Sequence, residues 1–334
     1  MSRDIGEIAS EWVVFEIKQF DILTIGDLCA DLVMMGDDLV PGFSQEEKLV
    51  DGYALRMGGS CSIFASQAAR LGLRVGLIGV VGDDAFADLI LDTLEESGVD
   101  TSLVLVDPQV QTGLSVHLQQ PDDRSILTYL GTITSVLPEH VSTELLHSTR
   151  HLHVGSYFLL PQLQAAFPTI VQEVKKAGGT VSLDTNWDPE EKWDRGLGQV
   201  LDYTDVFIPN EQELPAITRT HSIWAGLEKL KERIPIVAVK MGGDGALVQE
   251  GEALWRATVP EAEVVDTIGA GDSFDAGFLY GFLQGRPVEE CLAIASACGS
   301  ATVRAAGGTA GQLWEKDLAE WVPKIQIALA KSKG

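Results

Sequence analysis

The sequence predicts an α/β fold: a doubly wound, mostly parallel sheet flanked by helices, with a small β lid. Short, continuously apolar runs alternate with amphipathic stretches along most of the 334 residues. Such runs are typical of parallel strands that are buried on both faces of a sheet. Two segments, residues 33–57 and 101–131, break this alternation. With no internal repeat in the chain, we expect residues 21–330 to form a single domain after an N-terminal extension, residues 1–20.

The apolar runs and the helix-like stretches follow one another in order. Strands are predicted at residues 21–26, 74–82, 151–156, 178–186, 205–210 and 235–243, and helices at residues 62–72, 84–98, 163–179 and 221–233. In residues 101–131 we expect antiparallel strands joined by turns at "DPQ" and "QPDD". Inserted β segments in an α/β chain commonly form a flap over a site, so residues 33–57 and 101–131 are predicted to form a lid.

The charge balance excludes some classes of partner. The chain has 49 Asp and Glu against 24 Lys and Arg, a net charge of −25. Because this charge repels phosphate backbones and anionic lipids, we expect no nucleic-acid and no membrane partner. The four cysteines have no CxxC spacing, and no apolar run is long enough to span a membrane. We therefore expect reduced, buried thiols and a cytoplasmic protein.

The stretch "DTIGAGDSF" combines small residues with a carboxylate at the start of a predicted helix. Gly269, Ala270 and Gly271 can let backbone N–H groups converge there and form an anion site. Asp272 beside such a site is suited to act as a general base toward a hydroxyl that attacks phosphorus. The alternative is a first-turn carboxylate that only stabilises the helix dipole. A serine-hydrolase interpretation with Ser273 as nucleophile is disfavoured, because no histidine follows His221.

Two further motifs allow a ligand or a purely local function. In "PNEQE", Asn210 and Glu213 can hold hydrated Mg²⁺ against phosphate oxygens, or can cap a helix. In "RMGGSC", the pair Gly58 and Gly59 permits either close approach to a ligand or a plain turn. Of the histidines, only His117, on the predicted lid, is kept as a candidate substrate contact. His151 and His153 are expected to pack in the core.

The blocks "GDLCAD", "GGSCSIFASQAARLG", "PNEQE", "KMGGDGALV" and "DTIGAGDSFDAGF" occur in an order that resembles the ribokinase-like, or PfkB-type, carbohydrate kinase family. The resemblance runs from about residue 21 to residue 315. It implies a ribokinase-like fold and an ATP-dependent kinase that uses Mg²⁺ to phosphorylate a hydroxyl of a small sugar-like substrate. Asp272 then corresponds to the general base, and residues 269–271 correspond to the anion hole.

The same resemblance assigns the other site residues. It implies nucleotide contacts at Asn210, Glu213, Gly242 and Gly245, with Mg²⁺ held through water by Asn210 and Glu213. It also implies sugar contacts at Asp31, Gly58 and Gly59, and a monovalent-cation site such as K⁺ at Asp266 and Ile268. In many relatives the lid pairs between subunits, which implies a homodimer.

The chain departs from the family pattern mainly on the substrate side. Cys29 and Ile63 stand where asparagine is usual, and neither side chain replaces an amide. Asp188 stands where arginine is common, which removes a partner for an acidic substrate. Lys240 replaces a small hydroxyl residue, and a cation at this place could contact a nucleotide phosphate. Asp275 replaces an asparagine and is expected to face the packed helix or its cap. Two alternatives remain open: a nucleoside kinase of the same family and a non-catalytic ligand-binding protein on the kinase fold.

Overall fold

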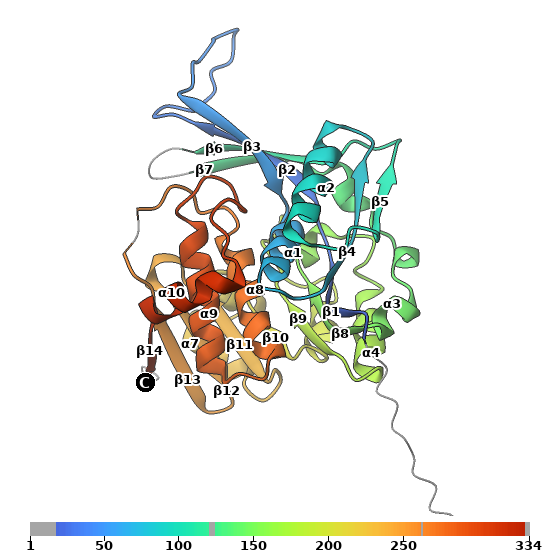
Figure 1. The fold of residues 1–334 in the computed structure, drawn as a ribbon, viewed down its shortest axis with the longest axis vertical. Helices are drawn as coiled ribbons and strands as arrows, with labels where there is room; N and C mark the ends of the chain where they lie inside the picture. Colours follow the sequence, from blue (N-terminus) through green and yellow to red (C-terminus); the bar gives the residue numbers. More distant parts are fainter. Residues whose placement is uncertain (1–17, 120–123, 262, 331–334) are drawn as a thin grey trace, which may run out of the picture.

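A ten-stranded sheet forms the centre of this computed structural model, which describes residues 18–119, 124–261 and 263–330 (Figure 1). Its order is β14-β13-β12-β11-β10-β9-β8-β1-β4-β5. The strands are β1 Phe20–Ile25, β4 Val75–Gly82, β5 Val104–Asp107, β8 Thr149–Val154, β9 Thr180–Leu183, β10 Val206–Phe207, β11 Ile236–Lys240, β12 Ala246–Glu250, β13 Ala253–Thr258 and β14 Gln326–Leu329. From β5 to β11 neighbouring strands pair in parallel, and β12 to β14 continue the sheet antiparallel. The predicted mostly parallel sheet is confirmed.

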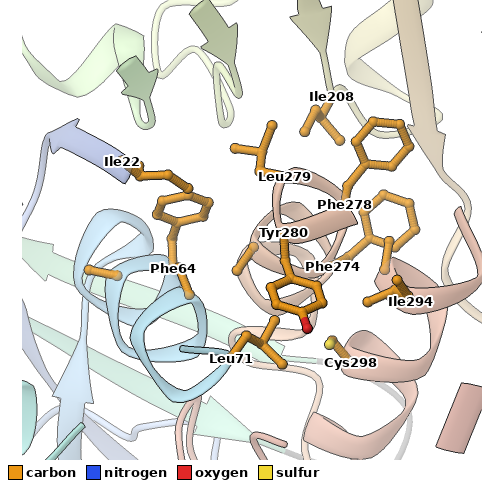
Figure 2. Packing of buried hydrophobic residues seen from close by; sticks show 14 of the residues in the cluster. Ile22, Phe64, Leu71, Ile208, Phe274, Phe278, Leu279, Tyr280, Ile294 and Cys298 are labelled. Atoms are coloured by element: carbon orange, nitrogen blue, oxygen red, sulfur yellow. The ribbon is translucent and has the colours of Figure 1, made fainter. Parts of the chain in front are cut away.

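Helices cover both faces of this sheet. One layer consists of α1 Ser60–Arg70, α2 Ala85–Ser97, α8 Ala270–Leu283, α9 Val288–Thr302 and α10 Leu318–Trp321. The other consists of α3 Thr143–His147, α4 Phe167–Lys176, α5 Leu197–Leu201, α6 Glu213–Thr218 and α7 Ile223–Leu230. In the first layer, Phe64 of α1 lies across from Leu279 and Tyr280 of α8, and Phe274 of α8 lies near Ile294 of α9 (Figure 2). This packing fixes the position of α8, whose first turn reaches the site described below.

A second sheet of four strands, in the order β3-β2-β6-β7, extends beyond the layers as a lid (Figure 1). Its strands are β2 Cys29–Met35, β3 Gly52–Gly58, β6 Gly113–Gln119 and β7 Arg124–Tyr129. The central pair, β2 and β6, is parallel, and the outer pairs are antiparallel. Two segments distant in sequence therefore form one sheet, as expected for the lid.

The lid differs from its predicted limits at two places. It begins at Cys29, and the expectation of antiparallel strands throughout residues 101–131 is wrong for β5. After helix α2 the chain crosses over and pairs β5 in parallel with β4, at the edge of the main sheet. The turn predicted at residues 120–123 lies outside the described residues, as do residues 1–17 of the predicted extension.

All four cysteines are buried, as expected. Of the helices in the described ranges, none is long and apolar enough to cross a membrane.

Candidate active site

A cavity of about 1000 Å³ lies between the lid and the carboxyl ends of the parallel strands. This is the edge at which open α/β sheets bind ligands. Among the predicted site residues, the cavity is lined by Asp31, Gly59, His117, Asn210, Glu213, Lys240, Gly242, Gly245, Ile268, Gly269, Ala270, Gly271 and Asp272. Gly58 and Asp266 do not line the cavity, but Gly58 adjoins Gly59 and Asp266 accepts a hydrogen bond from the backbone of Ile268. Residues from distant parts of the chain thus meet around one space.

The first turn of α8 forms one wall of this cavity. Gly269 precedes the helix in the left-handed conformation, with φ of 72°, and as the N-cap residue it has no side chain of its own to cap the helix. A Cβ at this position would lie 2.6 Å from Gly308 Cα, so only glycine fits. Gly269, Ala270 and Gly271 all line the cavity, and uncapped N–H groups at a helix start attract an anion.

Asp272 follows these residues and faces the same cavity. Burial raises the pKa of its carboxyl to about 8; the negative charges of Asp184 and Asp27 add to this effect, while Lys240 opposes it. A carboxyl that titrates near neutral pH is suited to accept a proton from a hydroxyl.

Lys240, at the end of β11, lies between two buried carboxyl groups. Its Nζ donates to Asp184 Oδ2 at 2.7 Å and to the two carboxyl oxygens of Asp275 at 3.1 and 3.2 Å. Burial raises the pKa of Asp184, but the charge of Lys240 and several hydrogen bonds outweigh it and leave this pKa lowered. Burial and the nearby Asp184 raise the pKa of Asp275 well above its usual range. Asp275 was expected to face the packed helix or its cap; it is buried on α8, and its carboxyl group in addition binds Lys240.

Asn210 and Glu213 form the reciprocal arrangement of a helix start. Asn210 Oδ1 accepts from the backbone N–H of Glu213 at 2.9 Å, and Glu213 Oε2 accepts from the N–H of Asn210 at 2.9 Å. Burial, with the charge of Asp184, raises the pKa of Glu213 to about 7, and Lys240 opposes this rise. Both residues also line the cavity, so a capping function and a ligand function are compatible here.

The turn after β11 carries Gly242 and Gly245, both with positive φ, of 52° and 87°. The turn forms the cavity wall beside Lys240, where no side chain at Gly242 obstructs the approach of a ligand.

The lid closes the opposite end of the cavity. Asp31 on β2 lies with its Oδ1 3.2 Å from Nε2 of His117 on β6, and both side chains are buried. A Cβ at Gly58 would lie 2.1 Å from Asp31 Cγ, so the glycine leaves room for this carboxylate. Gly59, with φ of 86°, lets the chain turn into α1 beside the cavity. The predicted contacts Asp31 and His117 therefore belong to one polar group.

Cys29 and Ile63, the two residues that stand where asparagine is usual, have different surroundings. Cys29 lines the cavity, and burial with the charges of Asp31 and Asp27 raises the pKa of its thiol well above the usual range, which keeps the thiol neutral. Ile63 packs with Val33 and Ile268 in a small apolar cluster where the lid meets α1. Isoleucine therefore contributes to lid packing at this position.

A polar network at the start of α1 was not predicted as part of the site. Asp27 accepts from the backbone N–H groups of Ser60 and Cys61, at 3.0 and 3.2 Å, and from Ser156 Oγ at 2.7 Å. Asn186 donates to Ser60 Oγ at 2.6 Å and to Ser156 Oγ at 2.7 Å. The sequence indicated these residues only by their position, because Asp27 and Asn186 each stand at the end of a predicted strand.

Asp188 and Asp266 accept hydrogen bonds from backbone N–H groups and do not line the cavity. Asp188 accepts from the N–H groups of Glu190, Lys192 and Trp193, at 3.0, 2.8 and 2.8 Å, so it organises its own loop. Asp266 Oδ1 accepts from the N–H of Ile268 at 3.0 Å, and Oδ2 from that of Gly307 at 2.9 Å.

The two strand histidines pack in the core, as expected. His151 hydrogen-bonds Thr180 and Ser182, and the ring of His153 stacks on Phe64 at 3.9 Å between centroids. Burial lowers the pKa of His153 to about 3, so this ring is neutral.

Comparison with known proteins shows the family to which this chain belongs. The family model described as pfkB family carbohydrate kinase matches residues 19–316. The ATP-dependent ribose-1-phosphate kinase of Halopiger xanaduensis is 35% identical over 246 residues, which cover 73% of this chain and 79% of that protein. The 5-dehydro-2-deoxygluconokinase of Geobacillus thermodenitrificans is 28% identical over 306 residues, which cover 86% and 88%. A solved structure of Arabidopsis thaliana ribokinase complexed with ribose and ATP has a TM-score of 0.78 and 26% identity, covering 91% of this chain and 98% of that one.

The chain therefore belongs to the pfkB family of carbohydrate kinases. It has the ribokinase-like fold and is an enzyme of the sugar kinase class. The expected family is confirmed, which leaves the alternative of a non-catalytic binding protein without support. The hydrolase interpretation is also excluded, because Ser273 is completely buried.

Proposed function

We propose that this kinase transfers the terminal phosphoryl group of ATP to a hydroxyl of a small, hydroxyl-rich sugar. One observation supports this most directly: the uncapped N-terminus of α8 and the carboxyl of Asp272 face the cavity that Asp31 and His117 close at its other end. An acceptor held at the lid would thus reach the general base and the anion hole together.

In this proposal, Asp272 takes the proton from the attacking hydroxyl, and the N–H groups of residues 269–271 stabilise the charge on the transferring group. The ionised form of Asp272 does this work. Because burial opposes ionisation, the nearby positive charge of Lys240 favours the active form.

The residues beside the anion hole fit a nucleotide with its metal ion. Asn210 and Glu213 offer an amide and a carboxylate oxygen at the cavity wall, the ligand type that hydrated Mg²⁺ prefers. When bound, Mg²⁺ would neutralise charge on the phosphate oxygens. The turn at Gly242, where a Cβ would meet nothing within 4 Å, offers space for the nucleotide.

The sugar end of the cavity favours a substrate with several hydroxyl groups. Asp27, Asp31 and Asn186 supply carboxylate and amide groups there, and Ser115 and Thr128 of the lid supply hydroxyls. Because Cys29 and Ile63 replace amide groups, we do not expect ribose to bind as it does in ribokinase. A nucleoside is the second candidate, since Ile63 and Ile126 give the same end an apolar surface.

We further propose that the lid forms a homodimer. Strand β7 alternates: Thr128 faces the cavity, whereas its neighbours Leu127 and Tyr129 are 61% and 52% exposed. Tyr53 of β3 is 71% exposed. An apolar sheet face of this kind is suited to bury itself against a second copy.

Two remaining features support further proposals. Asp266, buried next to the loop of Ile268, supports a K⁺ site in which this loop supplies ligands. Free, buried thiols agree with a reducing compartment and support a cytoplasmic location.

An ATP-consumption screen tests the proposed function. Purified protein with Mg²⁺ is offered sugars, sugar acids, sugar phosphates and nucleosides, each with and without K⁺, and Asp272→Asn is the control. We expect phosphorylation of a neutral sugar that depends on Asp272. If no compound is phosphorylated, or if the control is equally active, the proposal is wrong.

A further inference from the structure

Two charged residues that are 35 positions apart in sequence meet in the structure, Lys240 at the end of β11 and Asp275 on α8. Their side chains form a buried ion pair, with Nζ 3.1 Å from Oδ1. Lys240 is also paired with Asp184, so without Asp275 the lysine would keep one partner. Without Lys240, the carboxyl groups of Asp275 and Asp184 would lie together with no cation between them. The lysine therefore stabilises both carboxyl groups.

The ion pair leaves one donor of Lys240 available. An ammonium group has three N–H donors. Asp184 accepts one, and the two oxygens of Asp275 share another. No further acceptor for Nζ occurs in residues 18–119, 124–261 and 263–330, and the side chain lines the cavity. Nζ lies 3.6 Å from the point that a Cβ on Gly271 would occupy, so the third donor is at the anion hole.

We propose that Lys240 donates this third N–H to the nucleotide phosphate at the anion hole, while Asp275 acts as a positioning residue that holds the ammonium group there. The inference rests on the proposed function. Asp275 itself is buried and does not line the cavity, so it can act on a ligand only through Lys240.

Lys240 could instead serve only to neutralise its two carboxyl partners. The oxygens of Asp184, Asp272 and Asp275 lie within 4.8 Å of one another, so removal of the lysine destabilises the protein under either hypothesis. A double substitution distinguishes the two hypotheses for Lys240. In Lys240→Met combined with Asp275→Asn, the lost positive charge is balanced by one carboxyl fewer. Stability then recovers, but no phosphate contact returns.

The experiment compares the wild type, the two single variants and the double variant. Thermal unfolding reports stability, and calorimetric titration with ATP, with and without Mg²⁺ and without acceptor, reports nucleotide affinity. Lys231→Met is the matched control, because Lys231 is as little exposed as Lys240, at 16% against 14%, and is paired with Glu252 away from the cavity.

We expect Lys240→Met to weaken ATP binding about 10- to 100-fold, as for loss of a charge-assisted hydrogen bond. Asp275→Asn should weaken it several-fold, because the lysine is held less firmly. The double variant should melt at a higher temperature than Lys240→Met, yet bind ATP no better. Lys231→Met should bind ATP like the wild type.

Two results would overturn the inference: wild-type ATP affinity in Lys240→Met, or affinity restored together with stability in the double variant. Failure of the proposed function gives a different pattern, in which the wild type binds ATP but phosphorylates no acceptor. A wild type that does not bind ATP would overturn both proposals.

Discussion

Asp272→Asn tests the chemistry of the site most directly. Asparagine has nearly the same shape and keeps the first turn of α8, but its amide cannot accept the proton of the attacking hydroxyl. A positioned general base contributes about 100- to 10,000-fold to the rate, so the barrier should rise by about 3–5 kcal/mol. ATP binding should survive, since the backbone N–H groups of residues 269–271 are unchanged.

The pH dependence supplies a second measure of the same residue. With a pKa of about 8 in the free enzyme, Asp272 is about 1% ionised at pH 6. The wild-type kcat/KM should therefore rise up to tenfold per pH unit and level off above pH 8. Asp272→Asn should lose this rise.

Stability should change in the opposite direction to activity. The unfolded carboxyl loses its proton near pH 3.8, whereas the folded one keeps it until about pH 8. Between these values the native state binds more protons, so stability falls as pH rises. The full shift of about 4 pKa units corresponds to roughly 5 kcal/mol. Because Asp272 borders a solvent-accessible cavity, we expect asparagine to recover only about 1–2 kcal/mol at pH 8.

Steady-state kinetics from pH 6 to 9 and urea unfolding of both proteins provide the measurements. A variant that turns over near the wild-type rate, or a flat wild-type profile, would refute the assignment of Asp272 as the base.

Three other substitutions test the supporting structure. Gly269→Ala should destabilise the protein by about 2–3 kcal/mol in urea, because it strains a positive φ and meets Gly308 at 2.6 Å; an unchanged midpoint would contradict this geometry. Asp188→Ala should cost about 2 kcal/mol at pH 7 with kcat unchanged, because three backbone N–H groups lose their acceptor. Since the pKa of Asp188 is lowered in the folded state, its contribution is present above pH 4 and is lost as pH falls through the folded pKa; equal losses at pH 7 and pH 3 would refute this. Leu127→Glu should convert a dimer into a monomer in light scattering, and a wild-type protein that is already monomeric would disprove the lid interface.

The sequence could indicate much of the candidate site around the start of α8, because its residues are neighbours in the chain. Gly269 to Asp272 are consecutive, and Asn210 and Glu213 share one helical turn. Residues three or four positions apart are neighbours on the surface of a helix, so the local sequence determines how they lie relative to one another. The alternation of apolar and amphipathic segments likewise indicated the parallel strands.

The edges of the fold were harder to predict. Strand β5 is short, with the sequence VLVD, and suits an antiparallel lid as well as a parallel sheet edge, so only its contact with β4 decides between them. The network around Asp27 and Asn186 had the same difficulty, because polar residues after strands are common and their partners come from other segments.

The sequence alone determined the family, the parallel sheet and the first turn of α8 with its carboxylate, because these depend on period, local turn geometry and contiguous motifs. Only the tertiary structure showed that Asp31 meets His117 across two lid strands and that Lys240 pairs with Asp275. Such pairs depend on distance in space, because a charge is stabilised by whichever group reaches it within a few ångströms.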